Sequence, residues 1–321
     1  MKRPTFRVVL AIAAGTVYLS ADARAVLTLL SDTFDTAASS ANYNEAKTAD
    51  AAAVFGFDYS ALGIGVAPNT TDGSTTGLRF SANESAGATN GITLHTVQSF
   101  TGEYTVRFDA WINANGPFPL GGAGSTEFLT AGVGGDGTTV NLSDLTPTGV
   151  GAWTAVDGEG GSFRDYRAFK DAGEQFPGSG QFAAGTDTSA NNNSNPYYSP
   201  FGDVNVDALN QGGSQTGTTA AGSFGFEWHE VELSVEDGFM TWAINGLEIA
   251  TLNPNIGASF STDGSVTLGY QDISSSISDS PTHSFGLIDN LTVTAIPEPS
   301  SVFLLSAIGA VGLVKRRRQR R

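Results

Sequence analysis

Hydrophobic and polar residues alternate with a period of two in several stretches of the chain. Residues 103–112 (EYTVRFDAWI) place Tyr104, Val106 and Phe108 on one face and mostly polar residues on the other. Residues 228–235 repeat this pattern, with valine and leucine alternating with glutamate and serine. Alternate residues of an extended chain point to opposite faces, so the pattern predicts half-buried β-strands.

Asn245-Gly246 separates two apolar-rich runs in residues 239–252 (FMTWAINGLEIATL). Asn and Gly readily adopt the positive φ angles of a type I′ turn, so this stretch predicts a β-hairpin. Residues 265–270 and 284–294 predict further strands near the end of the body. Strands joined by turns and long polar loops, without interleaved helices, predict an all-β fold. We expect a β-sandwich that occupies residues 26–296 as one domain.

The first 25 residues have the organisation of a secretory signal peptide. Three cations lie within the first seven residues, residues 8–19 are mostly apolar, and Ala23-Arg24-Ala25 follows. Signal peptidase accepts small residues at the first and third positions of such a site. The sequence therefore predicts a signal helix in residues 1–25, cleavage after Ala25, and export.

The end of the chain, residues 297–321, has three parts. These are Pro297-Glu298-Pro299, an apolar run over residues 300–314, and a basic end that includes Lys315, Arg316, Arg317 and Arg318. As a helix the apolar run would be roughly 22 Å long, and a full span needs about 20 residues. We therefore expect a short transmembrane helix, with the basic residues as a stop-transfer signal on the cytoplasmic side.

This three-part order resembles the PEP-CTERM sorting signal of Gram-negative bacteria that produce exopolysaccharide. The resemblance covers about 25 residues and implies recognition by a membrane exosortase and cleavage near the Pro-Glu-Pro motif. It also implies a membrane-anchored intermediate, followed by delivery to the cell surface or extracellular matrix.

The body resembles the concanavalin A-like (laminin-G-like) jelly rolls of exported bacterial proteins. The resemblance is carried by FDYSALGIGVAPN (57–69), TTGLRF (75–80), residues 108–134 and VDGEGGSFRDYRAFK (156–170), which look like blocks recurring in surface proteins with PEP-CTERM tails. It bears on the fold far more than on the function, because unrelated activities share such folds.

Charge and composition exclude several classes of protein. The chain carries 16 basic and 32 acidic residues, and ten of the basic ones lie in the two end segments. The body is left with six basic and 30 acidic residues, a net charge of −24. So acidic a surface repels phosphate backbones, which excludes nucleic-acid binding. The chain has no cysteine, which excludes disulfides and thiolate chemistry.

The sequence does not predict an enzyme. Glycoside hydrolysis needs two carboxylates across the sugar bond, and the Glu-x-Asp-x-Glu string of laminarinase-like jelly rolls is missing. The nearest substitute is the pair Glu230 and Glu232, which a body so rich in acids produces by chance. None of the three histidines accompanies a serine in a Gly-x-Ser-x-Gly elbow.

Asp289 is a candidate Ca²⁺ ligand. Alternation over residues 285–293 places it on one face with four apolar residues. An unpaired buried carboxylate is costly, so the pattern predicts a polar partner, a metal or a β-bulge at Asp289. Related jelly rolls hold a structural Ca²⁺ between the closing and first strands, which implies Asp35 or Asp32 as the second ligand. The alternative is a capping hydrogen bond from loop amides.

Candidate ligand-binding residues are Trp111, Arg164, Tyr166 and Arg167. Trp111 lies opposite the apolar face of residues 103–112, which predicts an exposed ring on which a sugar could stack. Residues 164–167 hold two of the six cations of the body and could bind an anionic glycan. The alternatives are a core tryptophan and a structural cluster of ion pairs and stacked rings.

Together these features predict an exported, non-catalytic protein of the cell surface or exopolysaccharide matrix, with glycan binding as its candidate activity. The predicted partners are signal peptidase and exosortase during export, the inner membrane before processing, and exopolysaccharide. A glycan-active hydrolase or lyase with a divergent site on a jelly-roll scaffold is the alternative.

Overall fold

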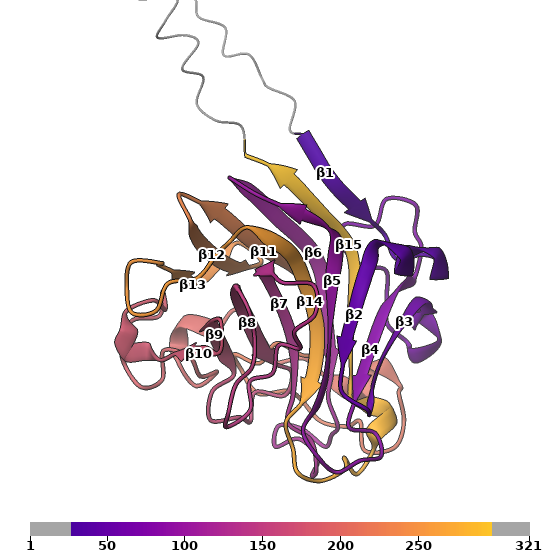
Figure 1. Cartoon of the computed structure of the whole chain (residues 1–321). Helices are drawn as coiled ribbons and strands as arrows, with labels where there is room; N and C mark the ends of the chain where they lie inside the picture. Colours follow the sequence, from indigo (N-terminus) through magenta and orange to yellow (C-terminus); the bar gives the residue numbers. More distant parts are fainter. Residues whose placement is uncertain (1–26, 297–321) are drawn as a thin grey trace, which may run out of the picture.

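The computed structural model describes residues 27–296, which form two facing β-sheets (Figure 1). The predicted all-β sandwich is thereby confirmed. The predicted signal helix, sorting motif and transmembrane helix lie outside the described residues. Within residues 27–296, no helix has the length and apolar character to cross a bilayer.

The larger sheet has eight strands in the order β13-β12-β11-β6-β15-β4-β3, with β1 also paired to β15. Its strands are β1 (Leu27–Asp32), β3 (Ala51–Asp58), β4 (Thr76–Ala82), β6 (Tyr104–Asn113), β11 (His229–Glu236), β12 (Phe239–Ile244), β13 (Leu247–Leu252) and β15 (Phe285–Ala295). Strands predicted from alternation thus appear as β6 and β11, which pair with each other.

The smaller sheet has seven strands in the order β10-β9-β8-β7-β14-β5-β2. They are β2 (Tyr43–Lys47), β5 (Asn90–Phe100), β7 (Glu127–Gly135), β8 (Ala152–Asp157), β9 (Tyr166–Lys170), β10 (Gly173–Gln175) and β14 (Gly264–Asp272). Short 3₁₀ helices interrupt the loops at Ala37–Asn42, Tyr59–Leu62, Pro177–Ser179, Pro196–Tyr198, Val206–Leu209 and Pro281–His283.

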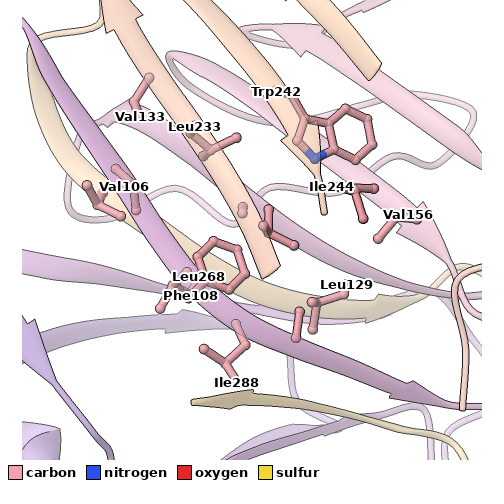
Figure 2. Close-up of a cluster of buried hydrophobic side chains, with 14 of the residues drawn as sticks. Val106, Phe108, Leu129, Val133, Val156, Leu233, Trp242, Ile244, Leu268 and Ile288 are labelled. Carbon is pink, nitrogen blue, oxygen red and sulfur yellow. The ribbon is translucent and has the colours of Figure 1, made fainter. Parts of the chain in front are cut away.

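The main hydrophobic core lies between the two sheets (Figure 2). The larger sheet contributes Val106, Phe108 and Leu233, and the smaller sheet contributes Leu129 and Leu268, all at most 3% exposed. Burying such a side chain stabilises the fold by about 1.5–3 kcal/mol. The period-two alternation of these strands therefore reflects one face packed into this core.

A second apolar cluster covers the outer face of the larger sheet. Its members include Tyr59, Trp111, Phe226 and Leu287, which come from β6, β15 and the loops that cross them. Trp111 is only 4% exposed, with its ring 6.5 Å from that of Phe226 and 5.8 Å from that of Trp228. The predicted exposure of Trp111 is therefore wrong, because long loops bury the face that alternation assigned to solvent.

Strand β15 contains a bulge that divides its apolar positions between two faces. Its register with β6 shifts between Asp289 and Thr292, and Asn290 has a φ of +54°. Phe285 and Leu287 pack in the outer cluster, whereas Leu291 packs in the main core. The single apolar face predicted for residues 285–293 is thus wrong, and the bulge offered as one alternative is confirmed.

The predicted hairpin is present as strands β12 and β13. Ile244 pairs with Leu247, and Asn245 and Gly246 between them have φ angles of +50° and +76°. Positive φ at both central residues is the signature of a type I′ turn. The Asn-Gly pair is needed here because it adopts this conformation at little steric cost.

Candidate functional site

A pocket of about 470 Å³ lies at the end of the smaller sheet where β5, β7 and β9 begin and β14 ends. Hydroxyl-bearing residues make up much of its wall, together with two arginines, one carboxylate and two aliphatic side chains. The lining residues are Thr89, Thr126, Ser143, Asp144, Leu145, Arg164, Arg167, Ile273 and Ser275. The structure therefore brings two predicted ligand-binding residues, Arg164 and Arg167, into one cavity.

Arg167 is fixed in the floor of this pocket. Its side chain projects from β9 over the ring of Phe128, with the guanidinium carbon 4.3 Å from the ring centroid. It donates hydrogen bonds to the backbone oxygens of Ser143 (2.8 Å) and Arg164 (3.1 Å) and is 5% exposed. Burial lowers the pKa of Arg167 from its usual value. A guanidinium held so rigidly loses little conformational entropy when a ligand binds.

Arg164 lies at the rim of the same pocket. Its Nε atom is 2.9 Å from Oε1 of Glu174, and its guanidinium lies 5.9 Å from the ring of Phe163 and 5.1 Å from that of Phe176. Phe163 is 85% exposed and Phe176 is 50% exposed. Neither ring is predicted as a site residue from the sequence, although Phe163 directly precedes Arg164 in the block 156–170.

Tyr166 lies away from the pocket, in the main core. Its ring stacks on that of Tyr198 at 4.1 Å, and its hydroxyl donates to the backbone oxygen of Gly222 at 2.6 Å. Its neighbour Arg167 faces the pocket because alternate residues of β9 point to opposite faces. Trp111 and Tyr166 thus do not join the two arginines at one site.

Asp35 and Asp289, the predicted Ca²⁺ ligands, both line a small pocket of about 40 Å³. Asp289 accepts hydrogen bonds from the hydroxyl of Tyr59 (2.9 Å) and the backbone amide of Asn290 (2.7 Å). Burial, with added repulsion from Asp35 and Asp109, raises the pKa of Asp289 to about 7. Asp289 thus has polar partners, and Ca²⁺ at this pair stays a prediction.

The carboxylate of Asp32 accepts hydrogen bonds from the surrounding fold. It accepts hydrogen bonds from the backbone amide of Phe34, the hydroxyl of Ser39 and the amide of Asn42. Across residues 27–296, no three carboxylate or imidazole groups are already arranged around a shared metal position.

Glu230 and Glu232, the pair considered for catalysis, each interact with another side chain. Glu232 forms an ion pair with Arg107 at 2.6 Å, and Glu230 accepts a hydrogen bond from Asn69. His229 is fully buried, and burial lowers its pKa to about 4. Its ring contacts the backbone oxygen of Phe224 at 2.8 Å, which suits a structural role.

Comparison with known proteins identifies the tail. Residues 295–321 match the PEP-CTERM protein-sorting motif. No curated protein matches the chain in sequence. The predicted sorting signal is confirmed, and it marks an exported protein that an exosortase sorts.

Several solved structures resemble the body at low sequence identity. A protein of unknown function with a galectin-like fold from Bacillus subtilis is 10% identical, with a TM-score of 0.42 over 84% of this chain and 96% of that one. The Ca²⁺/Man-bound exoplasmic/lumenal domain of VIP36 is 7% identical, with a TM-score of 0.42 over 81% and 85%. The carbohydrate-binding module CBM66 from Bacillus subtilis is 8% identical, with a TM-score of 0.33 over 73% and 93%.

Proposed function

We propose that this chain is a non-catalytic protein of the cell surface or extracellular matrix that binds exopolysaccharide at the pocket formed by Arg164 and Arg167. The observation that carries the proposal is the exposed ring of Phe163 beside Arg164, which lines the pocket. Sugar rings have apolar faces that stack on aromatic side chains and hydroxyls that bond to arginine and hydroxyl groups. The pocket offers the arginine and hydroxyl groups, and Phe163 beside Arg164 offers the aromatic face.

The alternative function, a glycan-active enzyme, is less well supported by the pocket. Among its lining residues, all within the described part of the chain, Asp144 is the only carboxylate. Asp144 accepts hydrogen bonds from Thr89 and from the backbone amide of Leu145. Glycoside hydrolysis by the common route uses two carboxylates about 5 to 10 Å apart. A lectin-like role therefore fits this cavity better.

The proposal is tested by screening the purified chain on a glycan array for both retention and product release. We expect retention without release. Phe163→Ala and Arg164→Ala should each raise the Kd for the retained glycan about tenfold, since one stacking or polar contact contributes about 1.4 kcal/mol. Val97→Ala and Arg107→Ala are matched controls: Val97 is 59% exposed, and Arg107 is paired with Glu232 away from the pocket.

Two results would count against glycan binding. An equal loss of glycan affinity in the pocket variants and the controls would indicate that the binding site lies elsewhere. Release of shortened glycan would favour the enzyme. Retention of no glycan at all would leave a structural coat protein as the better description.

A further inference from the structure

Five carboxylates gather at the end of the smaller sheet, behind the pocket. Glu127 begins β7, Asp157 ends β8 and Asp272 ends β14, while Glu159 and Asp165 lie in the segment that joins β8 to β9. Glu127 is the cross-strand partner of Asp272, and its neighbour Phe128 is the partner of Asp157. Antiparallel pairing thus brings acids from distant parts of the sequence together.

Part of this carboxylate cluster is satisfied by the protein itself. Asp272 accepts from the backbone amides of Thr126 and Ser274, Asp165 from those of Ser162 and Asn193, and one oxygen of Asp157 from those of Glu159 and Gly160. Such backbone bonds stabilise carboxylates without any counter-ion.

The remaining oxygens have no such partner. Among the described residues, both carboxylate oxygens of Glu127, Oδ2 of Asp157 and Oε2 of Glu159 are buried without a hydrogen bond. Glu127 is 0% exposed, and the hydroxyl of Ser125 near it does not reach hydrogen-bond geometry. Charged oxygens in this state cost several kcal/mol each unless something neutralises them.

Tyr270 gives a second and independent sign of a missing partner. It lies on β14 two residues before Asp272, it is 0% exposed, and its hydroxyl also has no hydrogen-bond partner within residues 27–296. Tyr270 pairs with Leu129 and Asp272 pairs with Glu127, so the phenol lies on the same face of the sheet as these two carboxylates. A neutral oxygen and several carboxylate oxygens therefore point into one buried region.

The cations within residues 27–296 do not balance these charges. Arg167 lies close to Asp157 and Asp165, yet two of its nitrogens donate to backbone oxygens in the pocket floor. The backbone at Gly121 packs so closely against Glu159 that a side chain there would overlap its carboxylate.

We propose that the carboxylate cluster holds a divalent cation of the Ca²⁺ type, with Glu127 and Glu159 as its principal side-chain ligands. Ca²⁺ takes six to eight hard oxygen ligands in a flexible geometry, and this region contains carboxylate, phenol and backbone oxygens. The unpartnered oxygens do not yet surround a common point. Glu127 and Glu159 have rotatable side chains that can turn to meet there.

The test is the melting temperature of the purified full-length chain at pH 8, first in a chelator and then in rising Ca²⁺. We expect a rise of about 3 °C for each tenfold excess of Ca²⁺ over its Kd. Glu127→Gln and Glu159→Gln keep the side-chain volume and remove one carboxylate ligand each. Both should lose the Ca²⁺-dependent rise, and both should melt no lower than the wild type in chelator, because each amide replaces a buried carboxyl group that has no counter-ion there.

Two controls locate the effect. Glu236→Gln changes an exposed acid at the end of β11 and should retain the full Ca²⁺ response. Asp289→Asn changes the other candidate Ca²⁺ site and should retain it as well. If Asp289→Asn loses the Ca²⁺-dependent rise in melting temperature and Glu127→Gln keeps it, the proposal is overturned in favour of the pair Asp35 and Asp289. No Ca²⁺ response in the wild type would overturn it in favour of protons shared among the carboxylates.

The proposal is separate from glycan binding. Ca²⁺ titration needs no glycan, and the array screen uses Phe163 and Arg164 rather than the carboxylates. Either proposal can therefore fail while the other stands.

Discussion

Individual side chains in this protein take their roles from the strand that carries them. Arg167 and Tyr166 are adjacent on β9, yet Arg167 enters the pocket and Tyr166 stacks in the core. Phe163, only three residues earlier, stays exposed because it lies in a loop beside Arg164. The chemistry of residues 163–167 is therefore divided between a surface site and the core.

His229 gives a prediction at this scale. Burial lowers its pKa to about 4 in the folded state, whereas the unfolded value is about 6.5. Between these pH values the unfolded chain binds the extra proton, so stability present above about pH 6.5 is lost as the pH falls toward 4. The full effect is about 3 kcal/mol. The stability difference between wild type and His229→Gln, from urea titrations, should shrink over this range. A difference independent of pH would contradict the assignment.

At the scale of elements, the β15 bulge links the two faces of the larger sheet. It turns Phe285 and Leu287 toward the outer cluster and Leu291 toward the main core, so one strand supports both. Asn290 stabilises the bulge by donating from its side chain to Asp109 (2.8 Å) and Thr70 (2.9 Å). Its positive φ of +54° is unfavourable for most residues.

Substitution of Asn290 separates these two contributions. Asn290→Gly removes the side-chain hydrogen bonds but tolerates the positive φ, and it should cost about 1–2 kcal/mol. Asn290→Ala should cost about 1 kcal/mol more, because alanine is strained in the left-handed region. Urea unfolding midpoints measure both values. Equal losses in the two variants would show that backbone strain plays no part here.

At the scale of the whole molecule, the β-sandwich and the sorting signal occupy separate parts of the chain. The sorting motif directs an exported chain to an exosortase, while the sandwich presents the pocket and the carboxylate cluster. The strongly negative net charge of the body favours solubility and attracts cations to its surface. The few cations of the body gather at particular sites, with Arg164 and Arg167 both in the pocket.

A reporter fused to residues 297–321 tests the sorting signal. The fusion should reach the cell surface when exosortase is present and accumulate in the inner membrane when it is deleted. A matched fusion in which Pro297-Glu298-Pro299 is replaced by alanines should behave like the deletion strain, because the motif is the part that the resemblance assigns to processing. Fractionation followed by immunoblotting measures both, and surface delivery without exosortase would remove the sorting assignment.

The sequence by itself determined the local features of this protein. Alternation identified β6 and β11, Asn245-Gly246 identified a hairpin, and the order of Pro-Glu-Pro, apolar run and basic end identified the sorting signal. These succeed because strand periodicity, turn conformation and a linear signal depend on residues that are close together in the chain.

Only the tertiary structure decided which side chains share a site. The exposure predicted for Trp111 was wrong because loops from distant parts of the sequence cover its strand. Neither the exposed ring of Phe163 nor the buried carboxylate of Glu127 could be recognised in advance, since alternation reports which face a residue takes and not what covers that face. Glu127 meets Asp272 through the pairing of β7 with β14, and pairing between residues so far apart in the sequence is set by the tertiary fold.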